Sequence, residues 1–309
     1  MNPASDISVI IPLYNKASSI ERTLRSVVGQ SVPPREIIVV DDGSTDSSAA
    51  VVERVASPLV RLVRQPNGGV SVARNRAMAE ASGRWVALLD GDDVWEKEYL
   101  ERLERLIAAY PDCGAYGMGF WVETDGRRTL GRFPDEEGVV DFFSLSMTRY
   151  VLIPSATTLN RELALSLGGF PEGMRMGEDQ FLWTKIARVA DVCFMPKPSV
   201  IYSRAATNRS AVIYRPEHTE FSFEQLYEPE RKDLSNEYIA RVALGKALIE
   251  SSRGGTEAAR RALEFFSYNT MSHRIERKVR ALNALPRFTR RWVLWIYNTL
   301  AWIIARKGL

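Results

Sequence analysis

Residues 36–44 read EIIVVDDGS, an apolar, β-branched run that ends abruptly in two aspartates and a glycine. An uninterrupted run of this kind is typical of a strand that is buried on both faces of a sheet. The upstream run ISVIIP, residues 7–12, has the same character, and we expect Pro12 to end that strand. Apolar residues at helical spacing lie between the two runs, where Ser18 or Ser19 can cap a helix.

Strand, helix and strand within so short a stretch form a βαβ unit, so the sequence predicts a parallel sheet with a right-handed crossover. The pattern then repeats, and polar or acidic clusters follow the strands. Ligands of such sheets bind beyond the carboxyl ends of the strands, so residues 1–100 are expected to form a nucleotide-binding half. The repeating elements are expected at 45–56 (helix), 60–63 (strand), 70–82 (helix) and 85–89 (strand).

Residues 101–216 have a mixed pattern and no Gly/Ser-rich linker before them, so we expect one α/β body whose second half binds the acceptor. A polar, helical extension is expected over 217–309. The sequence does not indicate a function for residues 217–270. In the second half, the expected elements are a helix at 97–109, strands near 114–123 and 128–133, an apolar stretch at 150–160 and a helix at 178–189.

The composition is that of a globular protein, with 309 residues, 45% hydrophobic and 26% charged. With only two cysteines and two histidines, we expect neither a disulfide scaffold nor a Cys/His zinc site. Any metal must therefore be a hard cation that carboxylates hold.

Five motifs follow one another along the first two thirds of the chain: SVIIPLYNK (8–16), EIIVVDDGSTD (36–46), NGGVSVARNRA (67–77), WVALLDGDD (85–93) and GEDQFLW (177–183). Together they resemble the family 2 glycosyltransferases over roughly residues 5–215. The resemblance implies an α/β, GT-A fold, with a Rossmann-like, mostly parallel sheet flanked by helices and a helical C-terminal extension. It also implies inverting transfer from a nucleoside diphosphate sugar, with a preference for uridine, in cell-surface glycan or polysaccharide synthesis.

Asp41 and Asp42 end the second strand, where a carboxylate can accept from a base N–H or a ribose hydroxyl. The resemblance assigns base recognition to Asp42, and the alternative is that one or both aspartates only close a turn. Tyr14 offers a flat ring to a base, or is a core tyrosine. The resemblance places the loop from Pro12 to Tyr14 over the base.

Asn67-Gly68-Gly69 precedes a helix that contains Arg74. Backbone amides at a helix start and a guanidinium can both face the anionic part of a donor, and the resemblance makes Arg74 the candidate residue. The alternative for Gly68-Gly69 is a plain turn.

Asp90-Gly91-Asp92-Asp93 closes an apolar strand, and the Asp-x-Asp spacing puts two carboxylates on one side of an extended segment. Mn²⁺ or Mg²⁺ on a diphosphate needs few protein carboxylates. We expect Asp92 to bind the metal directly and Asp90 to contact ribose or a metal-bound water. The alternative is a solvated acidic turn.

Glu178 and Asp179 open a helix, a position that the helix dipole alone favours for acids. The resemblance makes Asp179 the general base that deprotonates the acceptor, while Glu178 orients the acceptor or the loop. A single in-line displacement with metal at Asp92 follows. The segment 204–215 carries Arg204, Arg209 and Arg215 and could close as a lid, but it lacks the histidine that many relatives have there.

The C-terminal part is basic. Residues 274–309 hold nine Lys/Arg against the single acid Glu276, and they include WVLWIYNTLAWIIA, 292–305. As a helix these 14 residues span about 21 Å, short of the about 30 Å of a bilayer core. Trp and Tyr next to Arg290-Arg291 and Arg306-Lys307 predict a helix that lies on an anionic membrane. The alternative is a helix packed on the body or in a homodimer.

The N-terminal residues have no basic segment followed by a long apolar one, so a secretory signal is not expected. We therefore expect a cytoplasmic enzyme attached peripherally to the inner face of the cell membrane. Its expected partners are a nucleotide-sugar donor and a glycan or lipid-linked acceptor, and not nucleic acid.

Two other functions stay open. A sugar nucleotidyltransferase also uses a parallel sheet and aspartate-bound metal, but it places a Gly-rich basic loop after the first strand, where this chain has PLYNKASS. A catalytically inactive scaffold protein on the same fold is the other alternative, and intact Asp92 and Asp179 argue against it.

Overall fold

The computed structural model describes residues 5–55, 57–204, 219–286, 288–290, 292–293 and 295–296. The chain divides into two compact units, Met1–Phe221 and Ser222–Leu309. Arg209 and Arg215 of the expected lid, and residues 297–309 of the expected membrane helix, lie outside the described residues.

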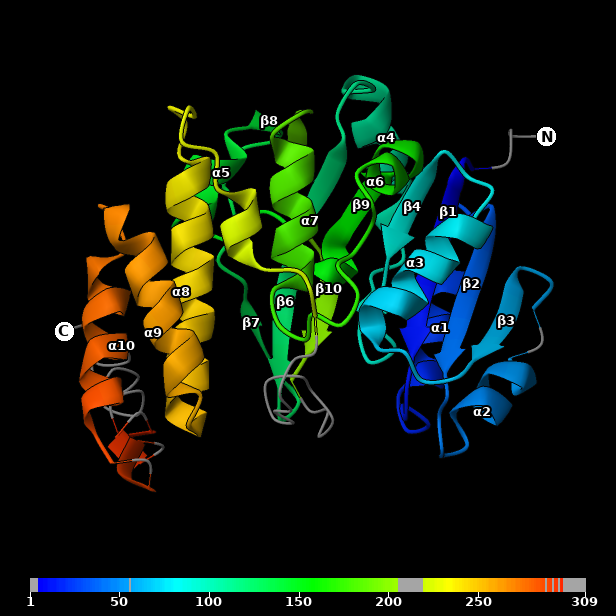
Figure 1. Ribbon diagram of the computed structural model, residues 1–309. Coiled ribbons are helices and arrows are strands. Elements are labelled where there is room, and N and C mark those ends of the chain that lie inside the picture. Colours follow the sequence, from blue (N-terminus) through cyan, green and yellow to red (C-terminus); the bar gives the residue numbers. More distant parts are fainter. Residues whose placement is uncertain are drawn as a thin grey trace. The chain divides into compact units, whose positions relative to one another are not determined.

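The described part of the first unit folds around one ten-stranded sheet (Figure 1). The strands are β1 (Ile7–Leu13), β2 (Glu36–Asp42), β3 (Val60–Gln65), β4 (Trp85–Leu88), β5 (Val94–Trp95), β6 (Ala115–Thr124), β7 (Arg127–Leu130), β8 (Gly138–Val140), β9 (Thr157–Asn160) and β10 (Val192–Ser203). Their order is β3-β2-β1-β4-β9-β6-β10-β5, with β7 on β6 and β8 on β10.

The first four strands form the parallel half that the sequence predicts, since β1 pairs in parallel with β2 and β4, and β2 with β3. Helices α1 (Ile20–Val28), α2 (Ser48–Arg54) and α3 (Val70–Glu80) connect them. Helix α3 packs on β1 and β2, and α1 contacts α2. Because helices cover the sheet, β1 and β2 are buried along almost their whole length.

We expected Pro12 to end the first strand, but β1 continues to Leu13. Strand β4 pairs with β1 only as far as Ile10, so Pro12 lies beyond it and keeps β2 as its neighbour, opposite Val40. A proline is tolerated in a strand where its missing N–H faces no partner strand.

The second half of the sheet is mixed. Strand β9 is antiparallel to both β4 and β6, whereas β6 and β10 are parallel. The helices of this half are α4 (Tyr99–Ala109), α5 (Phe142–Ser146), the 3-10 turn η1 (Pro154–Ala156), α6 (Arg161–Ser166) and α7 (Glu178–Ala187). Fully buried aromatic side chains, among them Tyr99, Tyr116 and Trp183, fill the core between these helices and the sheet.

The second unit is helical over its described residues. It comprises η2 (Phe223–Leu226), α8 (Ser235–Arg253), α9 (Thr256–Phe265), η3 (Phe266–Tyr268) and α10 (His273–Ala284), and the three α-helices pack on one another. Ile239, Leu263, Phe266 and Val279 are among its buried core residues. The helical extension expected over 217–270 therefore has a core of its own.

Arg290 is not one of the free cations that we expected beside the apolar tail. It is buried, and its Nε donates to the Leu285 carbonyl at 2.8 Å, with Nη2 3.3 Å from the Asn283 carbonyl. Carbonyls at the end of a helix lack partners in the helix, so a guanidinium there satisfies them. None of the helices described here has the length and apolar character of a membrane span.

Candidate functional site

The loop after β1 is fastened to the loop after β2. Asn15 has a left-handed backbone (φ 51°), its amide donates to Ser44 Oγ at 3.0 Å, and its Oδ1 accepts from the Thr45 amide at 2.8 Å. The Lys16 amide donates to Ser48 Oγ at 2.7 Å. Because β1 and β2 are parallel, these contacts join the two loops that follow the carboxyl ends of the strands.

Tyr14 lies in the loop after β1 and is 42% exposed, so the alternative that it is a core tyrosine does not hold. Pro12 lies two residues earlier in β1 and is half-buried. An exposed aromatic ring next to polar loops offers a stacking face to a ligand.

Asp42 ends β2, and its carboxylate holds the loop that precedes α3. The Gly68 amide donates to Oδ1 and the Gly69 amide to Oδ2, both at 2.8 Å. Gln65 Nε2 donates to Oδ1 at 2.8 Å and Asn67 Nδ2 to Oδ2 at 3.1 Å. A carboxylate has about four acceptor positions, and four donors of the chain use them.

This geometry corresponds to the turn alternative for Asp42, so base recognition by Asp42 requires that a loop donor leave. Asp41 differs, because its Oδ1 accepts only from the Ser44 amide, at 3.1 Å, and its Oδ2 accepts no hydrogen bond from any described residue. Asp41 therefore keeps acceptor capacity at the same strand end.

The three aspartates after β4 have three different environments. Asp90 Oδ1 is 2.8 Å from Arg74 Nη2, and Asp92 Oδ2 is 2.6 Å from Lys16 Nζ. Asp93 is buried, where it accepts from Ser155 Oγ and, at 2.7 Å, from the amide of Ser203. The solvated-turn alternative does not describe this cluster, since each carboxylate has a partner of its own.

Ser19 also contributes to this cluster, although not as we expected. It lies at the N-cap of α1 but makes no side-chain cap, because its hydroxyl donates to the Gly91 carbonyl at 2.9 Å. The start of α1 is thereby attached to the turn that carries Asp90 and Asp92.

Arg74 joins this turn to the start of α7. Its guanidinium is buried, with a side-chain exposure of 3%, and its Nη1 is 3.2 Å from Glu178 Oε1. The same guanidinium lies 5.2 Å from the centre of the Phe170 ring. Arg74 thus bridges Asp90 and Glu178 inside the protein instead of facing an open donor site.

Burial raises the pKa of both acids at the start of α7. Burial, together with the adjacent Asp179 carboxylate, raises the pKa of Glu178 to about 7, although Arg74 acts in the opposite direction. Burial also raises the pKa of Asp179, again against Arg74. Two carboxyl groups this close titrate as a pair, and one of them can serve as a general base near pH 7.

The chain matches the sequence profile "Glycosyl transferase family 2" over residues 8–183, which include the strand ends, Asp92 and Asp179. The chain belongs to glycosyltransferase family 2. Among the relatives of this glycosyltransferase, Mycobacterium tuberculosis MT1568 is 31% identical over 69% of the chain and 72% of MT1568. Streptococcus pneumoniae glycosyltransferase GlyA is 37% identical over 68% of the chain, but this covers 30% of GlyA.

Rhizobium meliloti succinoglycan biosynthesis protein ExoO is 35% identical over 44% of the chain and 41% of ExoO. Among solved structures, that of S. aureus TarS 1–349 in complex with UDP-GlcNAc has a TM-score of 0.63 and 21% identity, covering 93% of this chain and 91% of that one. This likeness confirms the predicted GT-A fold class.

Family 2 glycosyltransferases generally use a divalent cation. Among the described residues of the chain, no group of three or more His, Cys, Asp or Glu side chains is arranged to hold a metal ion. Asp92, however, is a hard oxygen ligand at a loop edge, and the Lys16 ammonium already stands in for a cation there at 2.6 Å. A cation that a diphosphate also binds needs few protein ligands, so these residues fit one.

Sequence reasoning missed Lys16 and Ser155. Lys16 lies within the motif SVIIPLYNK, which could have drawn attention to it, while nothing in the sequence connects Ser155 to residues 90–93.

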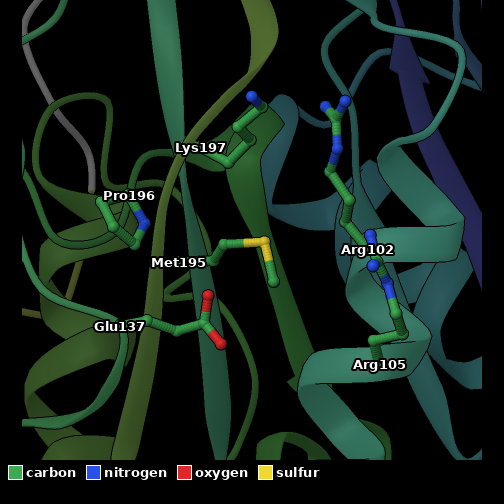
Figure 2. Close-up of a pocket in the computed structure, with 6 residues that line it drawn as sticks. All are labelled: Arg102, Arg105, Glu137, Met195, Pro196 and Lys197. Atoms are coloured by element: carbon green, nitrogen blue, oxygen red, sulfur yellow. The ribbon is translucent and has the colours of Figure 1, made fainter.

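A cavity of about 420 Å³ lies away from these strand ends, between α4 and the middle of β10 (Figure 2). Arg102 and Arg105 of α4 face Met195, Pro196 and Lys197 of β10 across it, with Glu137 as the acid. It contains none of the predicted site residues.

Proposed function

We propose that this family 2 glycosyltransferase moves a sugar, with inversion, from a uridine diphosphate sugar to an acceptor hydroxyl in polysaccharide synthesis. The observation that carries the proposal is the Arg74 bridge from Asp90 to Glu178, which brings the candidate metal turn and the candidate base helix to one edge of the sheet. The UDP-GlcNAc complex of TarS and the succinoglycan role of ExoO support the donor and pathway class.

Asp179 is the proposed general base, and Glu178 positions it. Asp179 Oδ1 accepts from the Gln180 amide at 2.8 Å, which fixes the carboxylate at the first turn of α7. In an in-line displacement the base takes the acceptor proton while the anomeric carbon inverts, and no covalent intermediate is needed. The pKa of Glu178, raised to about 7, and the raised pKa of Asp179 support proton uptake by this pair of acids.

Asp92 is the proposed metal ligand, with Asp90 beside it for ribose or a metal-bound water. A bound Mn²⁺ or Mg²⁺ would neutralise charge on the departing diphosphate. Arg74, which we expected to face the donor, acts in this proposal as the residue that positions Asp90 and Glu178.

For the base, Tyr14 and Pro12 remain the proposed stacking surface. Asp42 remains the aspartate that the family resemblance indicates. Its four loop contacts, and the free Oδ2 of Asp41, favour Asp41 as the residue that accepts from the base.

The test is incubation of the protein with Mn²⁺ and a panel of nucleotide sugars, followed by identification of the released nucleotide product. Release of a nucleoside diphosphate supports the proposal. In a parallel incubation with a sugar phosphate and a nucleoside triphosphate, release of pyrophosphate indicates a nucleotidyltransferase. Binding without any product indicates a scaffold.

Peripheral attachment to an anionic membrane is part of the proposal, and a lipid-linked acceptor would fit it. Phe288, Trp292 and Trp295 are 80%, 69% and 62% exposed, which supports an apolar surface that a lipid interface can cover. Since Arg290 is used inside the helical unit, the attachment depends on the aromatic side chains and on other cations. Packing in a homodimer is the competing proposal for the same surface.

A further inference from the structure

Lys16 holds the carboxylate that the proposed function assigns to the metal. Its Nζ is 2.6 Å from Asp92 Oδ2, and the two side chains are only 17% and 14% exposed. A largely buried charge pair is held closely, and removal of either partner leaves the other charge uncompensated. The ammonium therefore occupies one of the two carboxylate oxygens of Asp92 and competes with a divalent cation for this carboxylate.

The backbone of Lys16 cannot follow a displaced side chain. Its amide donates to Ser48 Oγ at 2.7 Å, and its carbonyl accepts from the amides of Ser19 and Ile20, each at 3.0 Å. The side-chain stem passes over Gly91, where an added Cβ would lie 3.6 Å from Lys16 Cγ. Any movement is confined to the flexible stem and its ammonium.

A divalent cation and the ammonium cannot share Oδ2 of Asp92, because the two positive charges repel each other at such a distance. A diphosphate that shares the cation with Asp92 would lie beside this carboxylate, so the flexible lysine stem could carry its ammonium there without backbone change. Ammonium groups bind phosphate as point charges.

The geometry points to Lys16 as an exchanging phosphate ligand: it neutralises Asp92 before metal binds, and it would contact the donor's diphosphate once a divalent cation takes Asp92. This inference rests on the proposed function, because it assumes metal at Asp92 and a diphosphate next to it. It adds a diphosphate-binding residue that makes metal and nucleotide bind more cooperatively, since each ligand favours the displaced ammonium.

The rival explanation is a static ion pair that only stabilises the loop. Both explanations allow a Lys16→Met variant to melt at a lower temperature, so stability does not separate them. The change in coupling between Mn²⁺ and uridine diphosphate on Lys16→Met does separate them. The bond between metal and diphosphate couples the two ligands in both explanations, but only an exchanging ammonium adds to that coupling.

The experiment measures binding of Mn²⁺ alone, by electron paramagnetic resonance of the free ion, and of uridine diphosphate with and without Mn²⁺, by calorimetry. The proteins are the full chain, Lys16→Met, Lys16→Arg and the control Lys97→Met. Lys97 is an exposed lysine on the same unit with no side-chain partner among the described residues. Lys16→Arg keeps the charge and reports on the fold if Lys16→Met is unstable.

We expect Lys16→Met to bind Mn²⁺ alone more tightly and uridine diphosphate with Mn²⁺ more weakly, each by about five- to tenfold, so that the coupling factor falls. Lys97→Met should match the unmodified protein, and Lys16→Arg should keep most of the coupling. Unchanged or weaker Mn²⁺ binding by Lys16→Met, with unchanged coupling, would overturn the inference. If the unmodified protein binds neither Mn²⁺ nor the nucleotide, the proposed function itself fails.

Discussion

Arg74 and Glu178 lie 104 positions apart in the sequence, yet Nη1 of Arg74 and Oε1 of Glu178 are 3.2 Å apart. The second terminal nitrogen of the same guanidinium is 2.8 Å from Asp90. One buried cation thus connects the turn after β4 to the first turn of α7. The distance between the candidate metal site and the candidate base therefore depends on Arg74.

Replacing Arg74 with methionine should lower both stability and turnover. Two carboxylates lose their buried partner, which costs on the order of 3–5 kcal/mol in the free energy of unfolding. The base helix also loses its tie to the metal turn, so kcat should fall more than the donor dissociation constant rises. Chemical denaturation and steady-state kinetics measure the two effects.

Arg76→Met is the matched control, because Arg76 lies on the same helix and pairs with Glu80 at the surface. It should leave kcat unchanged and alter stability by no more than about 0.5 kcal/mol. Equal effects of the two substitutions would contradict the bridging role.

The raised pKa of Glu178 predicts a pH dependence of stability. The carboxyl has a pKa of about 7 in the folded protein against an ordinary 4.5, so the folded state binds a proton more tightly than the unfolded state. This contribution is fully present below about pH 4.5 and is lost as the pH rises to 7. Denaturation midpoints of Glu178→Gln and the unmodified chain should therefore converge at low pH and separate, in favour of Glu178→Gln, toward pH 7.

The same shift constrains activity. A general base must be unprotonated, so the acid limb of the kcat profile should lie well above the ordinary range of a carboxylate. An acid limb near pH 4 would mean that neither Glu178 nor Asp179 is the titrating base.

Asp41 and Asp42 should respond differently to conversion into asparagine. Asp41→Asn should weaken uridine diphosphate binding about tenfold while leaving the melting temperature nearly unchanged, since one protein donor is affected. Asp42→Asn should lower the melting temperature, because four donors of the chain converge on its carboxylate. Calorimetry and thermal melts decide, and a reversed pattern would restore Asp42 as the base reader.

The tail prediction concerns vesicle binding. Removal of residues 292–309 retains Arg290 and its contacts with Leu285 and Asn283, so the helical unit should stay folded. The shortened protein should lose binding to phosphatidylglycerol vesicles but keep donor hydrolysis. Trp292→Ser with Trp295→Ser in the full chain should weaken binding without truncation.

Salt provides the second readout, because screening affects only ionic contributions to vesicle binding. Raising salt from about 0.05 to 0.5 M should weaken binding of the full chain without abolishing it, because screening acts on the charges and leaves the burial of apolar side chains in place. Failure of the full-length chain to bind vesicles would contradict membrane attachment. Unfolding of the shortened protein would favour the alternative of a helix packed on the body.

The parallel half of the fold was predictable because its strands are continuous apolar runs separated by amphipathic helices. Strands β9 and β10 were not predicted. Thr157 and Thr158 of β9 are polar although buried, and Pro196 and Pro198 interrupt β10, so neither segment has the periodicity of a strand. Antiparallel insertion of β9 depends on tertiary pairing that local pattern does not encode.

The candidate site likewise has parts that were predictable from the sequence and parts that were not. The Asp-x-Asp spacing made Asp92 a candidate and the family resemblance made Asp179 one, but neither could reveal which atoms meet. The Arg74 bridge, the Lys16–Asp92 pair and the buried Arg290 all join residues through contacts that only the folded chain defines.

The central claim is that Asp92 serves the metal and donor while Asp179 serves the acceptor, and parallel measurement of donor affinity and turnover in Asp92→Asn and Asp179→Asn tests it most directly. We predict that Asp92→Asn loses Mn²⁺-dependent donor binding. Asp179→Asn should bind donor almost normally and lose about 10²–10⁴-fold in kcat, the usual contribution of a general base. Normal Mn²⁺-dependent binding by Asp92→Asn, or normal turnover by Asp179→Asn, would contradict the account.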